Sequence, residues 1–170
     1  INYEKFKNYY KIYGFGLEGF NKKKNITLNA GNSGTLARLI LGLLVNYKFQ
    51  AKLIGDKSLS NRDFSRITDP LQIFGANIKT NNGKLPVLIK GSNFLRPINY
   101  IENIGSAQCK SAVMLAALKT RGKTKIKAKK SRDHTELLFK NINIPIKISK
   151  YKYYDKIEID GLYNYDGFEY

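Results

Sequence analysis

The sequence predicts an α/β fold in which one βαβαββ unit occurs twice in an inside-out, barrel-like domain, with helices inside and sheets outside. Three observations lead to this prediction. Similar polar segments recur at the same points of two stretches, about residues 29–90 and 102–160. In each stretch, apolar runs with helical spacing are followed by short runs typical of strands. The helical runs are apolar over much of their surface, which is typical of buried helices.

The first unit begins with a strand that leads into a glycine-rich turn at residues 31–35. A helix and a second strand follow, and a polar turn at residues 55–63 leads into another helix. Gly75 ends that helix, as a glycine commonly does. The elements we expect, in order, are a strand at 26–29, a helix at 36–45, a strand at 49–54, a helix ending at 74, and strands at 77–80 and 86–90.

The second unit repeats this order. Arg62-Asp63 and Arg132-Asp133 fall at the same point of the two units, 70 residues apart. Residues 1 to about 25 are interpreted as the tail of an earlier unit whose start is missing. The elements expected in the second unit are a strand at 97–101, a helix at 112–118, a strand at 123–128, a helix at 135–142, and strands at 144–148 and 156–159.

Composition limits the function classes. The chain has 170 residues, enough for one well-cored domain, and 42% of them are hydrophobic, which favours a folded state. One cysteine and one histidine exclude an internal disulfide and a zinc cluster, and no apolar run is long enough to span a bilayer. The net charge of +17 would suit a polyanion partner, so a basic nucleic-acid-binding module stays open. The lysines are spread along the whole chain, which favours a compositional origin of the charge.

The turn at residues 31–35 lies between a strand and a helix. Backbone N–H groups at a helix N-terminus can bind an anion, and glycine lets a ligand approach the backbone. The second unit has a similar turn at residues 105–108. The alternative is that Ser33 or Thr35 only caps the helix.

Arg62 and Arg132 each follow the second strand of a unit and precede a helix. A guanidinium binds phosphate or carboxylate through a planar fork, so both residues are candidates for an anion site. The alternative is a solvated arginine beside an aspartate that caps the helix. We interpret Cys109 as a core residue, and His134 as a surface or capping residue.

The polar turns of the two units contain four blocks: Gly31-Asn32-Ser33-Gly34-Thr35 with Arg38, residues 55–62 ending at Arg62, Ser106-Ala107-Gln108 continuing to Ala112, and Ser131-Arg132-Asp133-His134-Thr135-Glu136. Taken together and in this order, these blocks resemble the signature of the EPSP synthase (5-enolpyruvylshikimate-3-phosphate synthase) family. The resemblance covers nearly the whole chain, and residues 13–17 also resemble the stretch before the first block. One departure is Asp63, where the family commonly has proline.

The resemblance implies a fold of the enolpyruvyl transferase type and transfer of the enolpyruvyl (carboxyvinyl) group of phosphoenolpyruvate to the 5-hydroxyl of shikimate 3-phosphate. It implies no cofactor and no metal. The expected partners are the two small substrates, with no nucleic acid, no membrane and a monomeric full-length enzyme. The expected location is the cytoplasm, or a plastid if a missing N-terminus carries a transit peptide. Alternatives are a UDP-N-acetylglucosamine enolpyruvyl transferase and a relic that no longer catalyses.

The resemblance also assigns residues. Those expected on the phosphoenolpyruvate side are Asn32, Gly34, Thr35, Arg62 and Gln108, with Arg38 in support. Those expected to bind shikimate 3-phosphate are Ser106, Ala107, Gln108, Ser131 and Arg132. The resemblance places the acid–base residues in another domain. The chain is therefore expected to be most of the N-terminal, shikimate-3-phosphate-binding domain, and to be inactive by itself.

Overall fold

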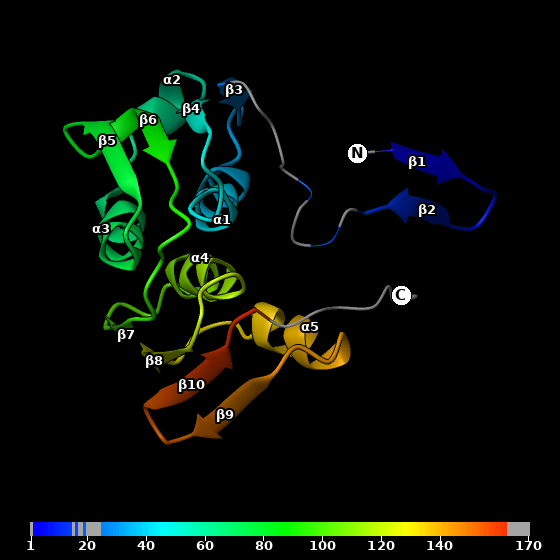
Figure 1. The fold of residues 1–170 in the computed structure, drawn as a ribbon, viewed down its shortest axis with the longest axis vertical. Coiled ribbons are helices and arrows are strands. Elements are labelled where there is room, and N and C mark those ends of the chain that lie inside the picture. The colour runs from blue at the N-terminus through cyan, green and yellow to red at the C-terminus, as the bar shows by residue number, and fades with distance from the viewer. Residues whose placement is uncertain (1, 15, 17–18, 20–24, 163–170) are drawn as a thin grey trace.

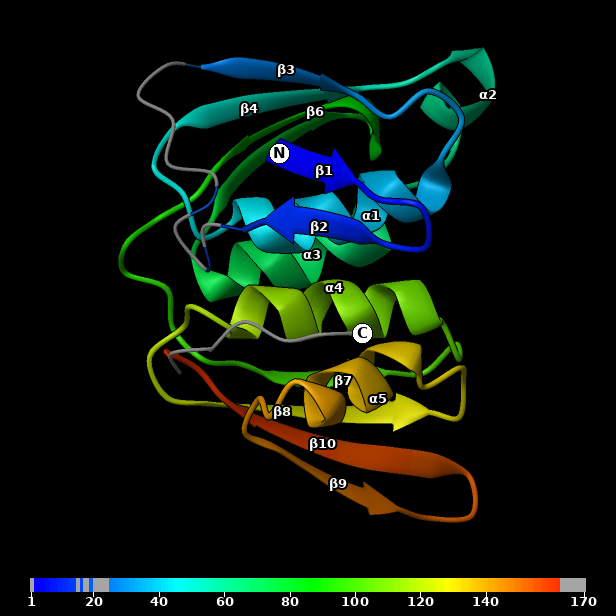
Figure 2. The ribbon, with the colours of Figure 1, turned by 90° about the vertical axis from the view of Figure 1, so that its right-hand side faces the viewer.

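The computed structural model describes residues 2–14, 16, 19 and 25–162. Two four-stranded sheets lie at opposite ends of the molecule (Figure 1). The helices α1, α3 and α4 lie between these sheets (Figure 2). Helices are therefore inside and sheets outside, as the sequence predicts.

The first unit forms one sheet with the strand order β3-β4-β6-β5. Its first two strands are parallel, and the other two pairs are antiparallel. Its elements are β3 (Ile26–Asn29), α1 (Gly34–Leu44), β4 (Gln50–Ile54), α2 (Lys57–Ser60), α3 (Ser65–Phe74), β5 (Asn77–Asn81) and β6 (Lys84–Lys90).

The second unit forms a sheet with the order β7-β8-β10-β9. Position for position this is the order of the first sheet, again with a parallel first pair and antiparallel others. The repeated βαβαββ unit is thus confirmed. Its elements are β7 (Asn99–Glu102), α4 (Ala107–Ala117), β8 (Lys123–Lys129), α5 (His134–Asn141), β9 (Ile146–Lys150) and β10 (Tyr154–Asp160).

The strand β8 shows why these sheets have one buried face. Successive side chains of a strand point to opposite faces. Thr124, Ile126 and Ala128 are buried, whereas the lysines between and beside them are exposed. The inner face packs on the helices, and the outer face carries lysine.

The helices α1 and α4 pack closely enough to join the two units into one core. Ala112 is fully buried. A Cβ atom on Gly42 would lie only 2.3 Å from the carbonyl oxygen of Ala112. The two backbones therefore approach at a point where α1 has no side chain, and buried residues from both units form one cluster.

Two helices differ clearly from the sequence-based expectation, and the ends of several other elements shift by up to two residues. The polar turn at residues 55–63 contains the short helix α2, because the Asp56 carboxylate accepts a hydrogen bond from Leu59 N at 2.7 Å. The helix expected at 112–118 begins at Ala107 instead, since Ser106 caps it. The first turn of α4 is polar, so apolar spacing alone missed it.

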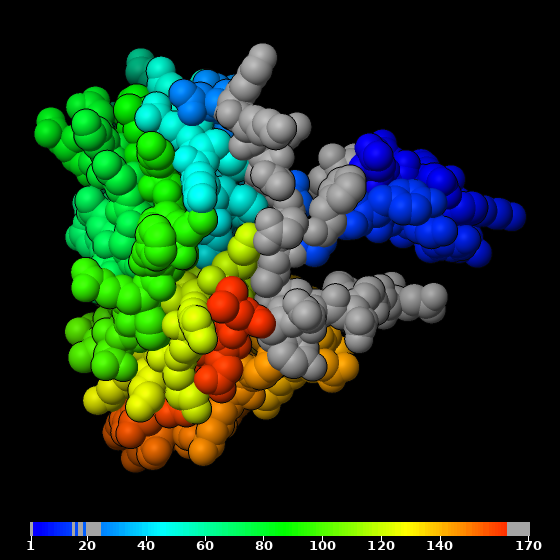
Figure 3. Space-filling view, in the orientation of Figure 1, coloured from blue at the N-terminus to red at the C-terminus, as the bar shows by residue number. Residues whose placement is uncertain are grey.

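A hairpin of β1 (Asn2–Lys5) and β2 (Tyr10–Tyr13) precedes the first unit. It stands apart from the two sheets (Figures 1 and 3). All its strand residues are exposed. Its antiparallel pairing fits the expectation that this stretch ends an earlier unit, which stays a prediction.

Replacing Gly42 with alanine should destabilise the protein. Alanine normally favours a helix over glycine, but this methyl would overlap the Ala112 carbonyl and force α1 and α4 apart. Overpacking of this kind costs about 1–3 kcal/mol. Urea denaturation of the full-length protein measures the change in the free energy of unfolding.

Gly14→Ala is the matched control, because a Cβ atom there would meet nothing within 4 Å. It should leave the free energy of unfolding nearly unchanged. A Gly42→Ala variant as stable as the wild type would show that the two helices do not pack as closely as described.

Candidate anion-binding site

The helices α1 and α4 begin with the same cap. The Ser33 hydroxyl accepts a hydrogen bond from Leu36 N at 3.1 Å, and the Ser106 hydroxyl accepts one from Cys109 N at 3.2 Å. Ser33 therefore caps α1, as the alternative interpretation predicts, whereas the Thr35 hydroxyl accepts a hydrogen bond from Gln108. A capping hydroxyl keeps its own O–H free to donate, so capping does not remove Ser106 from the candidate site.

Two guanidinium groups converge on the first turn of α1. Arg62 follows α2, and its Nη2 donates to Asn32 Oδ1 at 3.4 Å. A Cβ atom on Gly34 would lie 2.8 Å from Arg38 Nη1 and 2.9 Å from Arg62 Nη1. The absence of a side chain at Gly34 lets both cations lie against the helix N-terminus, where an anion is favoured.

Gln108 joins the two units at this point. Its Oε1 accepts a hydrogen bond from Arg38 Nη1 at 3.1 Å, and its Nε2 donates to Thr35 Oγ1 at 2.8 Å. Arg38 is itself held by the Gly34 carbonyl, at 3.4 Å, and by the ring of Phe64, 5.4 Å from Cζ to the ring centre. The cation faces the amide oxygen, so the orientation of the Gln108 amide is fixed by charge.

The five residues that the resemblance assigns to shikimate 3-phosphate line one pocket, together with Gly105. Arg132 supplies the cation. Ser131 Oγ is buried and has no hydrogen-bond partner among the described residues. Because a buried hydroxyl without a partner is costly, this atom is available to a ligand.

An adjacent pocket shares Ala107, Gln108 and Arg132 with the first. Among the residues that the structure describes, no carboxylate lines either pocket, so both favour an anion. Residues of this second pocket that the sequence analysis did not assign to the site are Leu39, Ser111, His134 and Thr135. His134 and Thr135 belong to the last block of the resemblance, and this position could have indicated from the sequence that they line the site.

The two aspartates beside the arginines do not cap their helices through their side chains. Asp63 accepts hydrogen bonds from Ser65 N at 2.8 Å and Ser65 Oγ at 2.6 Å, and these hold the pKa of its carboxyl below the usual range. Asp133 pairs with Lys150 at 3.3 Å, which lowers its pKa. Asp133 thus occupies the N-cap position of α5 without a side-chain cap hydrogen bond, and Asp63 bonds the first residue of α3 from one residue before its N-cap.

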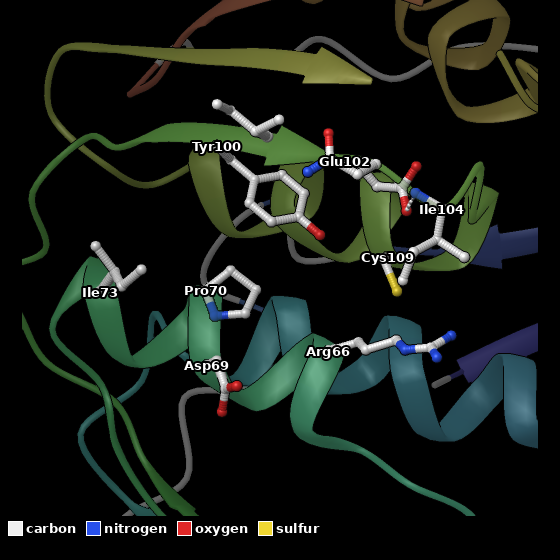
Figure 4. Close-up of a pocket in the computed structure, with 10 residues that line it drawn as sticks. Arg66, Asp69, Pro70, Ile73, Tyr100, Glu102, Ile104 and Cys109 are labelled. Carbon is white, nitrogen blue, oxygen red and sulfur yellow. Dashed lines mark hydrogen bonds between the residues drawn. The ribbon is translucent and has the colours of Figure 1, made fainter. Parts of the chain in front are cut away.

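A separate pocket of about 310 Å³ lies between α3 and β7 (Figure 4). Pro70 and Tyr100 face each other across it, and Cys109 and Arg66 lie toward its other end. None of the residues assigned to either substrate lines this pocket. Burial raises the pKa of the Cys109 thiol, and Cys109 is 4% exposed, which confirms it as a core residue.

Within the described ranges, no group of three or more histidine, cysteine or acidic side chains could hold a metal ion. No described helix is long and apolar enough to cross a membrane.

Comparison with known proteins identifies the relatives of this chain. A 3-phosphoshikimate 1-carboxyvinyltransferase of Ruthia magnifica subsp. Calyptogena magnifica is 48% identical over 142 residues, which cover 83% of this chain and 32% of that protein. One of Clostridium tetani is 41% identical over 156 residues, covering 91% and 34%. The structure of EPSP synthase from Acinetobacter baumannii superposes with a TM-score of 0.85 at 35% identity, covering 98% of this chain and 37% of that one.

The chain thus spans about a third of the length of these relatives. The model of the family described as EPSP synthase (3-phosphoshikimate 1-carboxyvinyltransferase) matches residues 3–170. With nearly the whole chain matched and the fold shared, this chain belongs to the EPSP synthase family.

Proposed function

We propose that the protein containing this chain transfers the enolpyruvyl group of phosphoenolpyruvate to the 5-hydroxyl of shikimate 3-phosphate, releasing phosphate. The observation that carries the proposal is the position of Gln108. It lies in the pocket with Arg132 and is bonded to Thr35 and Arg38 beside the first turn of α1. Two anion sites that share one polar side chain suit a reaction between two phosphate-bearing substrates.

In this proposal, the phosphate of shikimate 3-phosphate lies against Arg132, and the hydroxyls of Ser106 and Ser131 donate to it. Charge-assisted hydrogen bonds from a guanidinium are stronger than neutral ones. The pocket also contains Ala107 and Gln108, which would contact the rest of this substrate.

Phosphoenolpyruvate would lie at the first turn of α1. Arg62 supplies a cation, Asn32 holds Arg62, and the absence of a side chain at Gly34 lets Arg62 lie against this turn. Arg38 acts through Gln108 and not on the ligand itself. Both substrates are then held by cations in positions set before binding, which is favourable for stabilising charge that develops in the reaction.

In this proposal, the residues of this chain bind the two substrates but do not transfer protons. Forming the bond requires a base for the 5-hydroxyl and a proton donor to the enol carbon. No described residue of the two pockets is a carboxylate. We infer that the chain is most of the N-terminal domain, that residues elsewhere in the protein transfer the protons, and that the chain alone is inactive.

The alternatives carry less support. The relatives named above are 3-phosphoshikimate 1-carboxyvinyltransferases, which does not favour a UDP-N-acetylglucosamine enolpyruvyl transferase. Exposed lysines occur on the outer faces of both sheets, as a compositional origin of the charge would give. We therefore propose a monomeric enzyme of the cytoplasm with two small-molecule partners and no nucleic acid or membrane.

Replacing Arg132 or Arg62 with alanine in the full-length protein tests the proposal. Arg132→Ala should raise the KM for shikimate 3-phosphate, because it removes a charge-assisted phosphate contact worth roughly 1.5–3 kcal/mol. Arg62→Ala should mainly raise the KM for phosphoenolpyruvate. Steady-state kinetics with each substrate varied in turn separate the two effects.

Arg121→Ala serves as the control, since Arg121 is exposed and lines neither pocket. It should change neither KM. If both variants raise the two KM values equally, the residue assignment is refuted. A wild-type protein that produces no EPSP from the two substrates would refute the activity and favour a relic.

Gly34→Ala should selectively weaken the binding of phosphoenolpyruvate. The added methyl would lie within 3 Å of a guanidinium nitrogen of both Arg38 and Arg62 and would displace at least one of them. Displacing Arg62 removes its contact with the ligand, and displacing Arg38 frees the Gln108 amide that it orients, so the KM for phosphoenolpyruvate should rise about 10-fold or more, with a smaller change for shikimate 3-phosphate. An unchanged KM would mean that the ligand does not lie at the first turn of α1.

A further inference from the structure

We propose that Lys110 is a positioning residue that sets the location of Arg132 by holding its backbone; the part played by Arg132 in binding shikimate 3-phosphate rests on the proposed function. Lys110 is on α4, two residues after Gln108, and only 1% of it is exposed. Its Nζ donates to the carbonyl oxygen of Arg132 at 3.0 Å.

The same ammonium group pairs with Glu136. Glu136 lies in the first turn of α5 and is 2% exposed. Lys110 therefore contacts the turn that carries Arg132 and the helix that follows it. Ser111, the next residue of α4, adds a hydrogen bond of 2.7 Å between its hydroxyl and that of Thr135. All three contacts run from α4 to residues 132–136.

Residues two apart on a helix point to widely different sides. Gln108 lines the pocket, whereas Lys110 holds the Arg132 backbone and so does not line it. The guanidinium of Arg132 remains exposed to the pocket, since the contact uses only the main chain. One helix thus places two of the residues assigned to shikimate 3-phosphate, Gln108 directly and Arg132 through Lys110.

Stability does not account for this ion pair. Removing two charges from water is costly, and replacing a buried pair by apolar residues of similar size is often neutral or stabilising. Moreover, Glu136 Oε2 has no hydrogen-bond partner among the described residues, so the pair is incompletely satisfied. What an apolar pair could not supply is the donor to the Arg132 carbonyl.

The test compares Lys110→Met with the double variant Lys110→Met/Glu136→Met in the full-length protein. The single variant leaves Glu136 as an unpaired buried charge and should be strongly destabilised. The double variant removes that charge and should recover much of the stability, but it still lacks the donor to Arg132. In both, the KM for shikimate 3-phosphate should rise about 10-fold or more, while the KM for phosphoenolpyruvate changes little.

Lys140→Met is the control, because Lys140 is an exposed lysine on α5. It should behave as the wild type. If the KM for shikimate 3-phosphate returns to the wild-type value when the double variant regains stability, Lys110 has only a structural role and the proposal is overturned.

Amide hydrogen exchange tests the same contact without substrate. In the double variant, peptides covering residues 130–136 should exchange faster than in the wild type, whereas peptides from β8 should not. Unchanged exchange at residues 130–136 would overturn the proposal. If the wild-type protein does not turn over the two substrates, the proposed function fails, and this measurement still decides whether Lys110 holds the turn.

Discussion

The close packing of α1 against α4 is the constraint on which the rest of the structure depends. Each unit has a sheet with one buried face, and neither could bury its helices alone. A Cβ atom on Gly42 would overlap the Ala112 carbonyl oxygen at 2.3 Å, so the two helices meet backbone to backbone. Protein interiors are packed so densely that one added methyl group changes the packing and the stability. This contact therefore sets the distance between the two units and the positions of the side chains that meet between them.

The candidate site is a consequence of that distance. Thr35 and Arg38 belong to α1, and Gln108 belongs to α4, so their hydrogen bonds form only when the two helix N-termini lie side by side. Arg132 comes from the next segment and reaches the same pocket because α4 holds its backbone. The pseudo-symmetric repeat thus places equivalent turns together, while side chains that differ between the units give two unlike candidate anion sites.

Much of this could be predicted from the sequence, because the informative signals are local. The repeat was visible in the Arg-Asp pairs and the glycine-rich turns, and the strand order confirms it. The hydrogen bonds of Gln108 could not be predicted, since its partners lie 70 and 73 residues away. Lys110 was also missed: it precedes the helix expected at 112–118, and nothing in the sequence indicates its partner until α5 is placed. Helix α2 was missed because four polar-flanked residues have no periodicity to detect.

The openness of the candidate site gives a physical reason for the proposal that this chain alone is inactive. Asn32, Arg62 and Arg132 are exposed in this chain. Water around such groups weakens each ionic contact, because the interaction of two charges falls as the surrounding dielectric rises. A further domain that covered the pocket would exclude water and strengthen every one of these contacts at once. It would also bring carboxylates, which the described residues of the two pockets lack. In the proposed function, the same closure would supply both affinity and proton transfer, so the preformed cations of this chain would gain their full effect only when such a domain encloses them.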